Sequence, residues 1–95
     1  MPDAISPSDP LDTRKRKARF RAWHRGMREA DLVIGGFADK ELGAFNEIQL
    51  DQFESLLDEA DGDIVKWITG ELPVPARQDN DTVRRMIADA RSLAT

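Results

Sequence analysis

Apolar side chains recur at spacings of three and four along most of this 95-residue chain, a pattern typical of amphipathic helices. β-Branched residues are scattered and tyrosine is absent, so β-strands have little support. Glycines, prolines and capping residues divide the pattern, and we expect five helices, near residues 13–24, 27–42, 46–59, 61–70 and 81–93. The predicted fold class is therefore all-α, as a compact five-helix bundle.

The first predicted helix has an apolar stripe and a glycine at its end. Thr13 is a plausible N-cap, and the stripe that we expect to face the core consists of Phe20, Trp23 and Met27. Gly26 either ends this helix in a left-handed C-cap or bends the chain into the next helix. The sequence thus predicts a helix junction at residues 25–29.

Two later helices contain residues with a clear conformational preference. Gly35 and Gly36 each cost about 1 kcal/mol relative to alanine inside a helix, so we expect close helix packing or a kink there. Asp61 or Asp63 can cap the start of the fourth helix, and Gly70 can end it.

The first residues differ in character from the rest. Residues 1–12 hold three prolines and three aspartates without a basic residue, which predicts a disordered N-terminal tail followed by one helical domain at residues 13–95. Mitochondrial transit peptides are normally poor in acids and rich in arginine, so this tail favours a bacterial, cytoplasmic protein. No apolar run approaches the roughly 20 residues of a membrane span, so we expect no membrane association.

The composition excludes most kinds of catalytic and metal-binding site. The chain has no cysteine, and His24 is its only histidine, so a thiolate site and a multi-histidine metal site are excluded and no obvious catalytic triad is left. Residues 59–63 (EADGD) look like the start of a calcium loop, but Ile64 and Gly70 stand where such a loop needs glycine and glutamate. We therefore expect a protein that is not an enzyme and has no metal or cofactor of its own.

Charge is segregated along the chain. Residues 14–28 contain eight Lys/Arg and no acid, whereas residues 29–71 contain twelve acids against two lysines. A basic helix that also carries Phe20 and Trp23 could bind nucleic acid, although the acidic remainder would repel a polyanion. It could also be a solvated face or a contact surface for a protein. We favour protein contact, because segregated charge steers a partner of opposite sign.

The remaining candidate site is the sequence RGMRE at residues 25–29. If Gly26 forms the turn, Arg25, Arg28 and Glu29 can project from one corner. The arginines could then make bidentate pairs with carboxylates of another surface, and the glutamate could pair with an arginine there. The alternative is an internal ion pair across the turn, and the residues alone favour neither.

This motif follows a basic helix with an aromatic residue and resembles the RGxxE signature of the SdhE family. These are FAD assembly factors of succinate dehydrogenase, called succinate dehydrogenase assembly factor 2 in mitochondria. A second family segment, at the matching distance downstream, is similar to Leu56, Leu57, Asp61, Asp63, Ile64, Trp67 and Gly70. The resemblance covers about residues 14–93. Carried over, the partner-binding residues are Arg25, Gly26, Met27, Arg28, Glu29 and Asp31.

The resemblance implies a five-helix domain that assists another protein. Members of the family bind the flavoprotein subunit of succinate dehydrogenase, in some bacteria also that of fumarate reductase, and promote covalent attachment of FAD to a histidine of that subunit. This chain is then expected to be a monomeric assembly factor, with FAD belonging to its client. A basic-helix nucleic-acid binder and a helical interaction module unrelated to flavoproteins remain as alternatives.

Overall fold

The computed structural model describes residues 10–93, and this part of the chain contains five α-helices, two short 3₁₀ turns and no strand. The helices are α1 (Pro10–Trp23), α2 (Arg28–Glu41), α3 (Glu47–Leu57), α4 (Asp61–Thr69) and α5 (Asp81–Leu93), and the turns are η1 (Leu42–Ala44) and η2 (Ala76–Gln78). The predicted all-α fold is confirmed. Most of the predicted tail, residues 1–9, lies outside the described residues.

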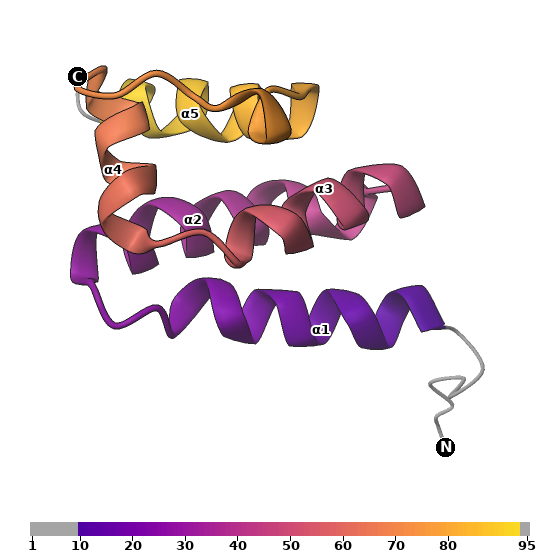
Figure 1. Cartoon of the computed structure of the whole chain (residues 1–95). Coiled ribbons are helices and arrows are strands. Elements are labelled where there is room, and N and C mark those ends of the chain that lie inside the picture. The colour runs from indigo at the N-terminus through magenta and orange to yellow at the C-terminus, as the bar shows by residue number, and fades with distance from the viewer. Residues whose placement is uncertain (1–9, 94–95) are drawn as a thin grey trace.

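The helices are arranged in layers around the α2–α3 pair. In Figure 1, α1 runs along one side of α2 and α3, and α5 lies on their opposite side. α4 stands across one end of the molecule and leads from the α3 level to the α5 level. The connection from α1 to α2 is at this same end, so the fold brings residues 25–29 next to the α3–α4 junction.

The first helix begins at Pro10, within the segment predicted to be a tail. Proline is well tolerated in a first turn, because its missing N–H would have no partner within the helix there. Asp12 adds a negative charge near the positive end of the helix dipole. Thr13 lies inside α1, so the prediction that it is the N-cap is wrong.

The buried face of α1 differs from the predicted one. Ala18 and Ala22 are buried, whereas Phe20 is 64% exposed and Trp23 is only partly buried. Because each helical residue turns the chain by about 100°, Phe20 lies on the side opposite to the two alanines. The predicted stripe of Phe20, Trp23 and Met27 is therefore wrong for Phe20. Small residues on the inner face let α1 approach its neighbours closely.

The glycine pair of α2 explains part of this close approach. A Cβ atom at Gly35 would lie 2.4 Å from the Trp23 ring, whereas one at Gly36 would meet nothing within 4 Å. The ring is also held at its polar edge, where Nε1 donates to Asp39 Oδ1 at 3.2 Å. The expected close packing is confirmed at Gly35 only.

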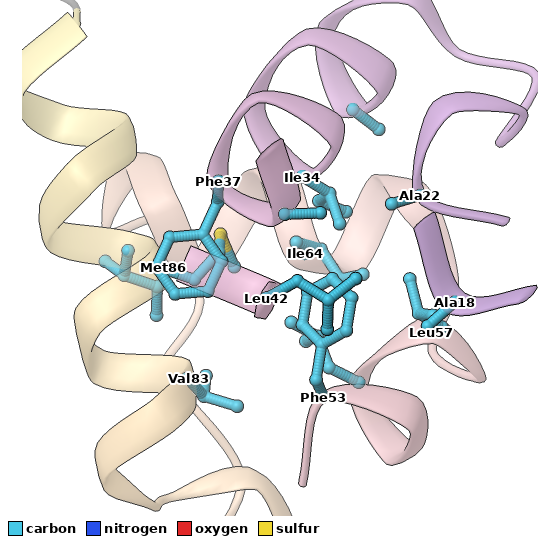
Figure 2. Packing of buried hydrophobic residues seen from close by; sticks show 14 of the residues in the cluster. Ala18, Ala22, Ile34, Phe37, Leu42, Phe53, Leu57, Ile64, Val83 and Met86 are labelled. Atoms are coloured by element: carbon cyan, nitrogen blue, oxygen red, sulfur yellow. The ribbon is translucent and has the colours of Figure 1, made fainter. Parts of the chain in front are cut away.

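The core lies between α2, α3, α4 and α5, and α1 closes it with its two alanines (Figure 2). Three rings meet there: the centroid of Phe37 is 6.0 Å from that of Phe45 and 6.1 Å from that of Phe53, spacings that are typical of aromatic pairs in protein cores. Fully buried aliphatic side chains surround these rings, namely Ile34, Leu42, Leu50, Leu56, Ile64, Val83 and Met86.

The two ends of α4 give one confirmed and one wrong prediction. Gly70 ends the helix in the left-handed region with φ +85°, as expected. At the other end the N-cap residue is Ala60, without a side-chain hydrogen bond, so the predicted capping by Asp61 or Asp63 is wrong. The carboxylate of Asp61 bonds to Arg25 instead.

Candidate docking site

The turn at residues 25–29 depends on the backbone conformation of Gly26. Its φ is +96°, in the region that side-chain-bearing residues rarely adopt. A Cβ atom there would meet nothing within 4 Å, so the constraint is conformational and not one of space. The predicted turn at Gly26 is confirmed, and it directs the chain from the end of α1 into α2.

The side chain of Arg25 points into the molecule and is only 9% exposed. Its Nε donates to Asp61 Oδ1 at 2.6 Å, its Nη2 donates to the carbonyl oxygen of Glu59 at 2.6 Å, and its Nη1 donates to the carbonyl oxygen of Leu57. The carbonyl of Leu57 lies in the last turn of α3, where backbone acceptors have no partner within the helix, and that of Glu59 lies just beyond it. Arg25 therefore joins the turn to the α3–α4 junction.

Asp31 fixes the same turn from the side of α2. Its Oδ1 accepts a hydrogen bond from the backbone N–H of Arg25 at 2.7 Å. The carboxylate lies in the first turn of α2, where the helix dipole favours negative charge. Met27 is partly buried and packs against the core. Three of the predicted partner-binding residues, Arg25, Met27 and Asp31, therefore hold the turn in shape.

The outer side of the turn carries Gly26, Arg28 and Glu29, and all three residues are exposed. Within the described part of the chain, the side chains of Arg28 and Glu29 form no hydrogen bond or ion pair. Most other lysines and arginines there do have a partner. An adjacent cation and anion without internal partners are free to pair with groups of another molecule.

Half of the cations of α1, namely Arg14, Arg19 and Arg21, are paired with acids from later in the chain. Arg14 donates to Glu54 Oε1 and to Asp51 Oδ1, both at 2.6 Å, and Arg21 donates to Asp58 Oδ1 at 2.7 Å. The bonds to Glu54 and Asp51 raise the pKa of Arg14. The basic and acidic segments thus partly neutralise each other within the molecule, which leaves fewer cations for a polyanion.

Two features of this region were missed by the sequence analysis. The rings of Phe20 and His24 stack at 4.0 Å on the surface beside the turn, and His24 Nδ1 lies 2.7 Å from the Phe20 carbonyl oxygen. Their spacing of four residues could have indicated this pair. The bond from Arg25 to Asp61 has no local signal, because 36 positions separate the two residues.

The described residues contain neither a metal-binding cluster nor a membrane-spanning helix. No group of three or more His, Cys, Asp or Glu in this part of the chain is arranged to hold a metal ion. In the same part, none of the helices combines the length and the apolar character that crossing a membrane requires.

Comparison with known proteins identifies the family. The profile of a family described as flavinator of succinate dehydrogenase matches residues 16–91, a range that includes the RGMRE turn and the second segment at residues 56–70. This chain belongs to that family. The resemblance to the SdhE family is thereby confirmed.

Individual relatives agree with the family. The chain is 36% identical to the FAD assembly factor SdhE of Acetobacter pasteurianus, over 87% of this chain and 76% of the relative. It is 34% identical to the mitochondrial succinate dehydrogenase assembly factor 2 of Saccharomyces cerevisiae, over 90% of this chain and 57% of the relative. It is 37% identical to the mitochondrial succinate dehydrogenase assembly factor 2-B of Drosophila ananassae, over 84% of this chain and 50% of the relative. The chain thus spans about half the length of these mitochondrial relatives.

Proposed function

We propose that this chain is an assembly factor that binds the flavoprotein subunit of succinate dehydrogenase and promotes covalent attachment of FAD to it. Family membership supports this function, as do the names of relatives from bacteria and mitochondria. The observation that carries the site is that Arg28 and Glu29 have no partner among residues 10–93, although the turn that presents them is held by internal hydrogen bonds.

In this proposal the two sides of the turn have different roles, one in contact with the client and one in support of the turn. Arg28 offers a planar guanidinium that matches a carboxylate bidentately, and Glu29 offers the complementary partner for an arginine or lysine of the client. Arg25 and Asp31 hold the turn from which these two side chains project. Of the two possibilities raised by the sequence, this proposal adopts outward contact for Arg28 and Glu29. No ion pair crosses the turn among the described residues, and Arg25 pairs with Asp61 of the α3–α4 junction instead.

The assembly factor acts by positioning. FAD belongs to the client in this proposal, and this chain supplies no acid, base or nucleophile. Docking would hold the flavoprotein subunit in a conformation that brings its histidine to the flavin. Correct orientation of reacting groups can lower a barrier by about 7–11 kcal/mol, so positioning is sufficient for a large effect.

The test is covalent flavin on the flavoprotein subunit, read as fluorescence after denaturing electrophoresis. It compares cells that have this gene, lack it, or carry Arg28→Glu or Glu29→Ala. We expect the signal to fall strongly in the deletion strain and in both variants. Lys17→Glu is the matched control, because Lys17 is another exposed cation without a partner in the described residues. An undiminished signal in the deletion strain would refute the function, and one in both variants would refute the site.

Three narrower expectations belong to the same proposal. The flavoprotein of fumarate reductase is a second client, the free chain is a monomer, and it acts in the bacterial cytoplasm, for which the Acetobacter relative gives some support. Sedimentation of the purified chain over a range of concentrations tests the monomer, and flavinylation of fumarate reductase in the deletion strain tests the second client. A nucleic-acid role has less support, because many cations of α1 are already paired with carboxylates.

A further inference from the structure

The exposed part of the turn is too small to hold a partner protein by itself. A stable protein–protein interface buries about 800 Å² from each partner and places apolar contacts at its centre. Gly26, Arg28 and Glu29 supply charge and little apolar surface. The docking surface must therefore extend over an adjacent part of the molecule that carries exposed apolar side chains.

Such a surface begins at Glu29 itself. A groove of about 310 Å³ between α2 and α5 is lined by Glu29, Leu32, Val33, Ala90 and Leu93. Leu32 is 51% exposed and Leu93 is 58% exposed, so the described part of the chain leaves two large apolar side chains open to solvent in one place. Figure 1 shows the start of α2 and the end of α5 at the same end of the molecule.

We propose that this groove, as an extension of the docking site under the proposed function, receives an apolar side chain of the flavoprotein subunit that has a lysine or arginine as its neighbour. The apolar side chain packs between Leu32 and Leu93, and the neighbouring cation pairs with Glu29 at the edge of the groove. The groove thereby adds the apolar contact that the turn lacks.

The occupant follows from the chemistry of the lining. The walls beyond Glu29 are apolar, and burial of an apolar side chain against Leu32 and Leu93 is favourable at about 25 cal/mol per Å². Glu29 has no partner within the described residues, so its carboxylate attracts a cation and repels an acidic segment. Because Glu29 also belongs to the turn, one partner can occupy both surfaces at once.

Substitution of the two leucines tests the groove. We expect Leu32→Ser with Leu93→Ser to weaken binding of the purified flavoprotein subunit by about tenfold or more. Thermal stability should fall only modestly, because about half of each side chain is already exposed in the free chain. Ile48→Ser is the matched control: this α3 residue is 67% exposed and does not line the groove, so its variant should bind as the wild type does.

Glu29→Ala and Arg28→Glu, measured beside these variants, separate the two proposals. If the turn variants lose binding and the leucine variant retains it, the groove proposal is wrong and the proposed function stands. If all of them retain binding and full flavinylation, the docking site is wrong as well. A wild-type chain that dimerises, together with a monomeric leucine variant of normal client affinity, would show that the groove binds a second copy and would overturn the inference.

A photo-crosslinking residue at position 32 then identifies the occupant. With purified flavoprotein subunit, we expect the crosslinked client peptide to place an apolar residue beside a lysine or arginine. A crosslinker at position 48 serves as the negative control. An acidic client peptide, or equal crosslinking from both positions, would contradict the proposed chemistry.

Discussion

Arg25 and Arg28 lie three positions apart in one turn, yet they differ in almost every physical respect. Arg25 is 9% exposed and donates to one carboxylate and two backbone carbonyls, whereas Arg28 is exposed and has no partner among the described residues. A guanidinium that is satisfied internally stabilises the fold, and one that is unsatisfied at the surface remains available to another molecule. The motif therefore combines a structural side with a docking side.

The largest expected loss of stability follows from substitution of Arg25, on the inner side of the turn. Arg25→Ala leaves the partly buried carboxylate of Asp61 and the carbonyls of Leu57 and Glu59 without their donor, so we expect the free energy of unfolding to fall by about 3–5 kcal/mol. Urea denaturation monitored by tryptophan fluorescence measures this. Arg28→Ala is the control and should stay within about 0.5 kcal/mol of the wild type. Equal losses in both variants would remove the distinction between the two sides.

The two adjacent glycines of α2 differ in a similar way: Gly35 packs against another side chain, whereas Gly36 has open space beside it. Gly35→Ala places a methyl group against the Trp23 ring, and we expect a loss of about 1–3 kcal/mol. Gly36→Ala meets open space in the same helix, so it should be neutral or stabilise the protein by up to about 1 kcal/mol. The same urea denaturation compares the two variants, and a stable Gly35→Ala protein would show that the Trp23 ring can move away at little cost.

Substitution of Gly26 affects both sides of the turn. A residue with a side chain pays about 1–2 kcal/mol for the left-handed backbone, and a shifted backbone also displaces Arg28 and Glu29. We expect Gly26→Arg to lose this stability and to support flavinylation poorly. Gly43→Ala is the control, because its Cβ atom also meets open space and its φ is not positive. A folded Gly26→Arg variant with full flavinylation would contradict the positioning mechanism.

The smallest expected change in stability comes from an ion pair on the outer face of the α3–α4 junction. Arg77 donates to both carboxylate oxygens of Glu59 at 2.8 Å and lowers the pKa of that carboxyl group. The pair therefore stabilises the fold above the unfolded-state pKa of Glu59, and this stability is lost as the pH falls through the lower pKa of the folded state. Unfolding free energies of wild type and Arg77→Ala should differ at neutral pH and converge in acid. A difference that persists after Glu59 is protonated would assign Arg77 another role.

Local patterns in the sequence were sufficient to predict the helices and the turn, because apolar spacing and the conformational preference of glycine act over a few residues. They were insufficient to predict which face of α1 is buried, because Ala18 and Ala22 form the inner face and the larger Phe20 faces solvent. The role of Arg25 also escaped prediction, because its acceptors lie in a different helix junction. Family resemblance supplied the candidate residues, and only the three-dimensional contacts divided them into inner and outer ones.

The hydrogen bonds of Arg25 have a consequence for anyone who would imitate this protein. A synthetic peptide that copies residues 24–31 would contain the full motif, but it would lack Asp61 and the carbonyls of Leu57 and Glu59 that orient its first arginine. Transplanting the motif onto another helical hairpin would meet the same obstacle. The smallest portable unit is therefore the turn together with the α3–α4 junction, two stretches of chain that only the folded domain brings together.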